Sequence, residues 1–182
     1  MKTFVVSTLA SVVLLALPLV ASAKGQIVRL IVHGADLSAA LEIIDSEVVG
    51  SFDIWQGPGV QVNGKSVHLN RDDPGPAFID WFNGASTERP TGLLRYEVTF
   101  VIDGRARGEY VILYEFDPSV AGGYVYLPGR GDAHASENVG LIYHGVEGNW
   151  FHSSARWERL VRPLVEQAAR ASWQRAAGEP GH

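Results

Sequence analysis

Five side chains able to transfer protons or hold a metal ion lie close together in the second half of the chain. They are Asp132, His134, Glu137, His144 and His152. Histidine and carboxylate side chains supply the general acids and bases of hydrolases, and they are the nitrogen and oxygen ligands that Zn²⁺ takes in proteins. If the chain is a small hydrolase or a metal-dependent enzyme, its site is therefore expected near residues 130–152.

A hydrolase would also need a nucleophile, and the sequence offers only serines near that segment because it contains no cysteine. Ser136, Ser153 and Ser154 are available, but none stands in the G-x-S-x-G turn that exposes a nucleophilic serine. The histidines do not form the H-E-x-x-H zinc motif either. We therefore predict no metal ion and no cofactor, and we favour a protein that is not an enzyme over the hydrolase.

Paired carboxylates give the enzymatic hypothesis a second form. Glu97, Glu109 and Glu115 fall in segments that alternate like strands, and two such groups at the right separation cleave glycosidic bonds. A glutamate on an exposed strand face is usually just solvated, but among the enzymatic hypotheses metal or sugar chemistry is favoured.

The segment GVQVNGKS, residues 59–66, matches the phosphate-binding pattern G-x-x-x-x-G-K-[ST]. The fixed positions are Gly59, Gly64, Lys65 and Ser66. A functional loop of this kind follows a buried strand and opens a helix, whose amide groups then face the phosphates. Here two short alternating runs are joined by Asn-Gly, which favours a two-residue β-hairpin. We interpret the match as false and predict no nucleotide.

The first residues, MKTFVVSTLASVVLLALPLVASAKG, indicate export. A lysine precedes an apolar run, and Ala-Ser-Ala follows it, which is the pattern of a secretory signal peptide over residues 1–23. A retained membrane anchor is the alternative, but the apolar run is at the short end of the roughly 17–25 residues that a spanning helix needs. The expected location is the periplasm or the extracellular space of a bacterium.

Composition narrows the partners. The chain of 182 residues carries a formal net charge of −5, whereas nucleic acids and anionic lipids reward a basic surface. No disulfide can form, and no other segment is apolar and long enough for stable membrane insertion after signal cleavage. We expect one domain over residues 24–175 and a disordered tail over residues 176–182.

Alternation of apolar residues predicts the fold as α+β. A strand is expected at 27–32, and a strand near Ile43 is followed by a short helix capped by Asp45. An antiparallel meander is expected from three runs of alternating residues, and the apolar segment AFIDWF should plug a loop onto the core. The three runs are 96–102, 109–116 and 124–127.

The C-terminal region predicts a further strand over 139–145 and then an amphipathic helix that packs on the meander. The helix should begin after Ser153 or Ser154, and Pro163 should kink it near Arg159. Its apolar stripe repeats at helical spacing and is expected to be core. The stripe consists of Trp157, Leu160, Val161, Leu164, Val165 and Ala168.

Four motifs, FIDW, YVYLPG, EGNWF and W-x-x-L-V-R-P-L, span residues 78–164. With them the chain resembles an uncharacterised family of small exported bacterial proteins. The resemblance implies no known activity and no catalytic residues. The two hypotheses are thus a non-catalytic binding or structural module of the envelope or extracellular space, with a small ligand or envelope component as partner, and the hydrolase described above.

Export has a direct test. We expect the mature protein to begin at Lys24, because the small residues Ala21 and Ala23 present the cleavage site. N-terminal sequencing of protein recovered from a bacterial host would read Lys-Gly-Gln. Recovery of Met1 in the membrane fraction would instead support the retained anchor.

Overall fold

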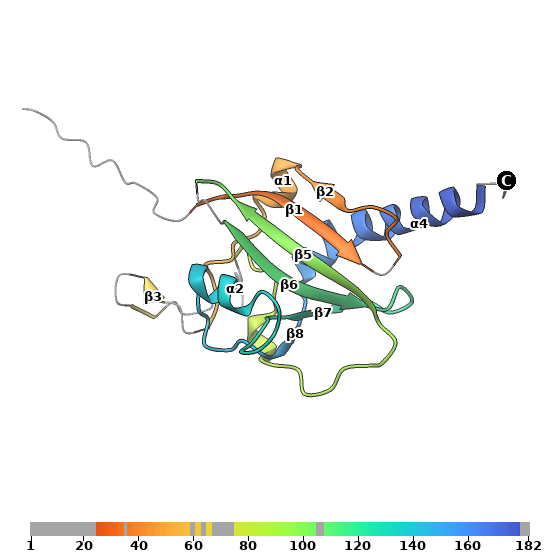
Figure 1. Cartoon of the computed structure of the whole chain (residues 1–182). Coiled ribbons are helices and arrows are strands. Elements are labelled where there is room, and N and C mark those ends of the chain that lie inside the picture. Colours follow the sequence, from red (N-terminus) through yellow and green to blue (C-terminus); the bar gives the residue numbers. More distant parts are fainter. Residues whose placement is uncertain are drawn as a thin grey trace, which may run out of the picture.

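The computed structural model describes residues 25–34, 36–58, 61–62, 65–66, 75–104 and 108–178 (Figure 1). Its main feature is a six-stranded antiparallel sheet in the order β2-β1-β5-β6-β7-β8. The predicted α+β class, with a meander packed against a C-terminal helix, is confirmed. The strands are β1 (Ile27–Gly34), β2 (Leu41–Ile43), β5 (Leu94–Ile102), β6 (Glu109–Phe116), β7 (Gly123–Tyr126) and β8 (Trp150–His152).

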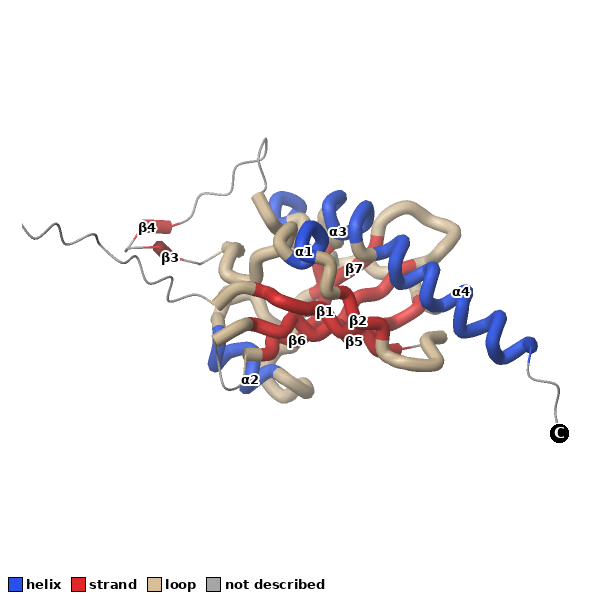
Figure 2. Tube along the Cα trace, turned by 90° about the horizontal axis from the view of Figure 1, so that it is seen from above, coloured by secondary structure: helices blue, strands red, loops and turns tan. Residues whose placement is uncertain are grey.

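Helices cover the two faces of this sheet unequally. Three of them, α1 (Ser46–Val49), α3 (Ala155–Leu160) and α4 (Arg162–Gly178), lie on one face, and α2 (Ala135–Leu141) lies on the other (Figure 2). Side chains alternate along a strand, so β6 divides into two sets. We call the face under α1, α3 and α4 the closed face, and it carries Tyr110, Ile112, Tyr114 and Phe116, all buried. We call the face under α2 the open face, and it carries Glu109, Val111, Leu113 and Glu115.

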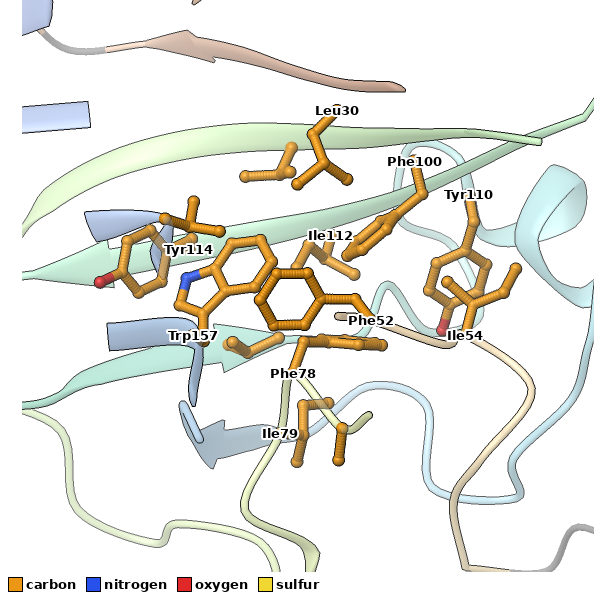
Figure 3. Close-up of a cluster of buried hydrophobic side chains, with 14 of the residues drawn as sticks. Leu30, Phe52, Ile54, Phe78, Ile79, Phe100, Tyr110, Ile112, Tyr114 and Trp157 are labelled. Carbon is orange, nitrogen blue, oxygen red and sulfur yellow. The ribbon is translucent and has the colours of Figure 1, made fainter. Parts of the chain in front are cut away.

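Trp157 of α3 is the centre of the core on the closed face (Figure 3). Its indole is fully buried and meets rings from separate parts of the chain. The ring centroids lie 5.0 Å from Phe52, 6.3 Å from Phe78, 6.0 Å from Phe100 and 5.6 Å from Tyr114. Such edge-on and tilted contacts are the favoured geometry for aromatic pairs. One indole therefore joins α3 to the sheet and to two loops.

The segment 77–82 packs as predicted. Phe78, Ile79 and Trp81 are buried, and the segment ends in a short 3₁₀ helix, η1 (Trp81–Asn83). Backbone and cap bonds fix it beside β8: Asp80 N donates to His152 O at 2.9 Å, and Ser154 Oγ donates to Ala77 O at 2.7 Å. We call residues 77–83 the plug.

The C-terminal helix is two helices. Ser154, one of the two serines predicted as the cap, caps α3 by accepting from Trp157 N at 3.1 Å. The chain then turns at Val161 before α4, two residues after the predicted position, because Pro163 has no N–H to continue the ladder. The buried stripe also lies slightly to one side of the predicted one. Its fully buried members are Trp157, Val161 and Val165, while Leu160 and Leu164 are half-buried.

In the N-terminal half, the prediction of a strand followed by a short capped helix is confirmed. The strand is β2, which pairs with β1, and the helix is α1. The Asp45 side chain accepts from Glu47 N at 2.8 Å and from Val48 N at 3.2 Å. These bonds satisfy amide groups that have no partner within the first helical turn.

The strand predicted over 139–145 is wrong, because helix α2 continues through Leu141 and residues 142–145 form no strand. In place of a paired strand, one side chain of α2 bonds to the backbone of β6. Asn138, 1 % exposed, donates from Nδ2 to Val111 O at 2.6 Å and accepts at Oδ1 from Val111 N at 2.8 Å. The amide thus takes the place of a strand backbone beside β6, just beyond the last β7 pair at Tyr126.

The hairpin predicted around Asn63-Gly64 is supported by the two pairs that are described. β3 (Gln61–Val62) pairs antiparallel with β4 (Lys65–Ser66). A strand therefore stands where a nucleotide-binding loop would open a helix, while Gly59 and Gly64 lie outside the described residues.

The two ends of the chain are described only in part. The predicted signal peptide, residues 1–23, and Lys24 lie outside the described residues, and α4 continues through residues 176–178, which were expected in the tail. Within the described ranges, no helix combines the length and the apolar character needed to cross a membrane.

Two tryptophans of the C-terminal helices give a matched test of this core. Trp157→Ala should lower the free energy of unfolding by about 3–5 kcal/mol, because a fully buried ring is lost from close packing. Trp173→Ala removes a ring that is 67 % exposed and should change it by less than about 0.5 kcal/mol. Urea denaturation of both variants beside the parent measures the difference, and equal effects would contradict the packing of α3.

Candidate functional site

Asp132, the first of the predicted site residues, belongs to the turn after β7. Its carboxylate accepts from the Tyr126 hydroxyl at 2.6 Å and from Gly129 N at 2.8 Å. The Tyr126 bond, and then the Gly129 bond, lower the pKa of the Asp132 carboxyl. The same bond is the main reason that the pKa of Tyr126 rises to about 12. Asp132 therefore holds its own loop and stays ionised.

His134 and Glu137 lie at the start of α2. His134 has a left-handed backbone, φ 64°, and its Nε2 is 3.3 Å from Glu97 Oε2 on the open face. Both side chains are about two-fifths exposed, 39 % and 40 %, so the pair is accessible to water. Glu137 points elsewhere and accepts from Ser136 Oγ at 2.9 Å.

His144 is buried in the core beyond the end of α2. Its Nε2 is 3.0 Å from Ile54 O, and because a carbonyl only accepts, the proton must be on Nε2. Nδ1 is then the acceptor for the Tyr110 hydroxyl at 3.5 Å, and Glu147 Oε1 is also 3.5 Å away. The ring stacks on Trp81 with centroids 5.7 Å apart. Burial lowers the pKa of His144.

His152 is exposed on the open face, in β8. Its ring lies 5.0 Å from that of Tyr124, its partner in the β7–β8 register. It is thus separated from His144, which is enclosed by the plug and β6, and from His134, which reaches to β5.

The five predicted residues therefore do not form one site. Within the described ranges, no group of three or more histidine, aspartate or glutamate side chains could hold a metal ion. The candidate serines are also used otherwise: Ser153 Oγ bonds Glu158 and Gly123 N, while Ser154 caps α3. The geometry for which the 130–152 segment was considered, a histidine beside a nucleophile, is not present in the described residues.

Of the three glutamates considered for glycoside cleavage, Glu115 is in an unusual place. It lies on the open face but is only 2 % exposed, because Arg89 and Arg95 both bind its carboxylate. The Arg95 contact is 2.5 Å long, and the Arg89 guanidinium also lies 4.3 Å from the centroid of the Trp150 ring. A buried carboxylate costs free energy unless it has such hydrogen-bonding partners. The two guanidinium groups thus satisfy the Glu115 carboxylate, which has a structural role.

A cleft that the sequence analysis missed lies beside this cluster, at the β8 edge of the sheet. Its volume is about 790 Å³, and we call it the edge cleft. One side comes from the cross-strand pair Tyr124 and His152, and the other, which we call the loop wall, comes from the last residue of the plug and the loop that follows it. The loop wall consists of Asn83, Ala85, Ser86, Thr87, Glu88, Arg89 and Pro90.

The loop wall of the edge cleft is tied to the sheet by its backbone. Ala85 forms a bridge with Phe151, and Ser86 N donates to Trp150 O at 2.7 Å. Ser86 Oγ donates to Glu88 O at 2.7 Å, and Asn83 Nδ2 donates to Asp80 Oδ2 at 2.6 Å. The wall is thus an extension of the sheet edge, which gives the cleft a fixed shape.

Comparisons of the chain with protein-family models, with curated proteins and with solved structures found no match. The fold and the edge cleft therefore define the chain only as an α+β domain with an open polar and aromatic cleft.

Buried His144 predicts a pH dependence of stability. Because its pKa is lowered in the folded chain, the unfolded chain binds the proton more readily. The contribution of neutral His144 to the free energy of unfolding is complete above the unfolded-state pKa of about 6.5. It is lost as the pH falls from there toward the folded-state pKa, by at most about 1.4 kcal/mol per pH unit. Urea denaturation between about pH 7.5 and about pH 5.5 measures how the free energy of unfolding changes with pH, and this change should be smaller for His144→Gln than for the parent. An unchanged slope would contradict a neutral buried His144.

Proposed function

We propose that this chain is an exported, non-catalytic binding module of the cell envelope or extracellular space, and that its ligand occupies the edge cleft. The observation that carries the proposal is the cleft itself. It combines a volume of about 790 Å³ with exposed polar side chains and two rings, on a backbone that is bonded to the sheet. Concave sites with a few fixed polar groups are the usual form of small-ligand sites.

The distribution of the titratable groups favours binding over catalysis. A general base must lie within hydrogen-bond reach of the proton that it removes. His152 is the one predicted site residue that lines the edge cleft, and its ring contacts Tyr124. His144 bonds inward to Ile54 O, and His134 pairs with Glu97. The signal peptide pattern supports the location.

Blocking the edge cleft tests the proposal. Ala85 lines it and is exposed, so Ala85→Trp should fill the space without disturbing the core. Washed insoluble envelope material from a Gram-negative bacterium is mixed with the mature protein and sedimented. We expect the parent to sediment with the material and Ala85→Trp to bind at least about tenfold more weakly, which corresponds to about 1.4 kcal/mol.

Val139→Trp is the matched control, because it adds the same ring at a position on α2 that is 47 % exposed and outside the edge cleft. This variant should sediment like the parent, and thermal melts should show that both variants fold. Equal retention of parent and Ala85→Trp, or no retention of the parent, would overturn the proposal. Release of soluble fragments by the parent, abolished in His152→Ala, would establish the hydrolase instead.

A further inference from the structure

The rings of β7 and β8 form two rows across the open face. Tyr124 pairs with His152, and Tyr126 pairs with Trp150, each pair with ring centroids 5.0 Å apart. The Trp150 row is already occupied, because the Arg89 guanidinium lies on its ring. The His152 row lines the edge cleft, where His152 is exposed and Tyr124 half-buried. A ligand therefore meets ring surface in this second row.

Formal charges around the edge cleft cancel. The lining contains one arginine, Arg89, and one exposed glutamate, Glu88. Beside the cleft, buried Glu115 binds both Arg89 and Arg95. Two arginines thus face two glutamates. An anion site normally presents guanidinium groups that can direct two parallel N–H donors at the ligand, whereas here the guanidinium groups bind Glu115. The balance favours an uncharged ligand.

The loop wall supplies both kinds of hydrogen-bonding group. Thr87 offers a hydroxyl and Glu88 a carboxylate that only accepts. Asn83 and Ser86 each donate to another group of the chain, to Asp80 and to Glu88 O, and their side-chain oxygens remain as acceptors. A ligand hydroxyl both donates and accepts, so a ligand with many hydroxyl groups can use the whole set. The apolar members of the lining are small, Ala85 and Pro90, and provide no deep pocket for a large apolar side chain of a peptide or for an acyl chain.

Resting on the proposed function, we propose that the edge cleft binds a neutral saccharide. One sugar ring lies with its C–H face against the Tyr124 and His152 rings, because aromatic faces carry negative charge density that attracts C–H groups. Its hydroxyls bond to the amide, hydroxyl and carboxylate groups of the loop wall. The wall is bonded to β8 before the ligand arrives, so little ordering opposes binding.

Calorimetry with defined oligosaccharides tests this assignment. The probes are cellotetraose, maltotetraose and the tetramer of N-acetylglucosamine, with tetragalacturonate as the acidic counterpart. We expect at least one neutral probe to bind and tetragalacturonate to bind no better. Tyr124→Ala should weaken the neutral probe about tenfold or more, since stacking on a ring is lost, whereas Tyr124→Phe keeps the ring and the affinity.

Tyr143→Ala is the control, because Tyr143 is 64 % exposed and does not line the edge cleft. It should bind the probe like the parent, and thermal melts should show that all three variants fold. A neutral probe that binds equally to Tyr124→Ala would overturn the assignment of the site.

Two further outcomes separate this inference from the proposed function. If only tetragalacturonate binds, with an affinity that falls in salt and is lost in Arg89→Ala, the neutral ligand is wrong but the binding cleft stands. If no probe binds while envelope retention still depends on Ala85, the saccharide is wrong and the binding module stands. If the retention experiment itself fails, the proposed function as a binding module is wrong.

Discussion

The burial of one indole ring holds the two halves of this fold together. Trp157 reaches from α3 into a space bounded by Phe100 and Tyr114 of the sheet, Phe78 of the plug and Phe52 of the loop after α1. The Trp157 Nε1 atom is buried without a hydrogen-bond partner among the described residues, which costs about 1–3 kcal/mol. The ring is retained at this cost because its area joins four separate segments at once.

The open face depends on a different balance. Although Glu115 belongs to the open face, it is not a solvated surface group, because it is 2 % exposed and paired with Arg89 and Arg95. Removing one partner of a buried ion pair leaves an uncompensated charge, so such a cluster fixes geometry more than it adds stability. Its consequence here is positional: Arg89 belongs to the loop wall, and its bond to β6 holds that loop against the sheet.

The sequence predicts the elements that local alternation defines. The β5–β6–β7 meander was predicted because the alternation of neighbouring residues determines it, and the plug was predicted from its aromatic residues. Helix α2 was not, because Val139, Ile142 and Tyr143 favour a strand, and the bond that decides the matter joins Asn138 to Val111, which is distant in sequence. The edge cleft was missed because its two sides are also distant in sequence. A partial signal was present, since alternate residues of YVY and WFH place their rings on one face of the sheet.

The edge cleft is connected to the core through short paths. Its loop wall starts at η1, where Trp81 stacks on His144 and packs 5.3 Å from Phe151 of β8. Its other side is β8, whose last residue is followed at once by Ser153 and by the Ser154 cap of α3. Both walls therefore leave the same packed region within a few residues. Because packed core positions move little, the backbones of the two walls are anchored at a set separation, which is the condition under which a shallow cleft can select a ligand by shape.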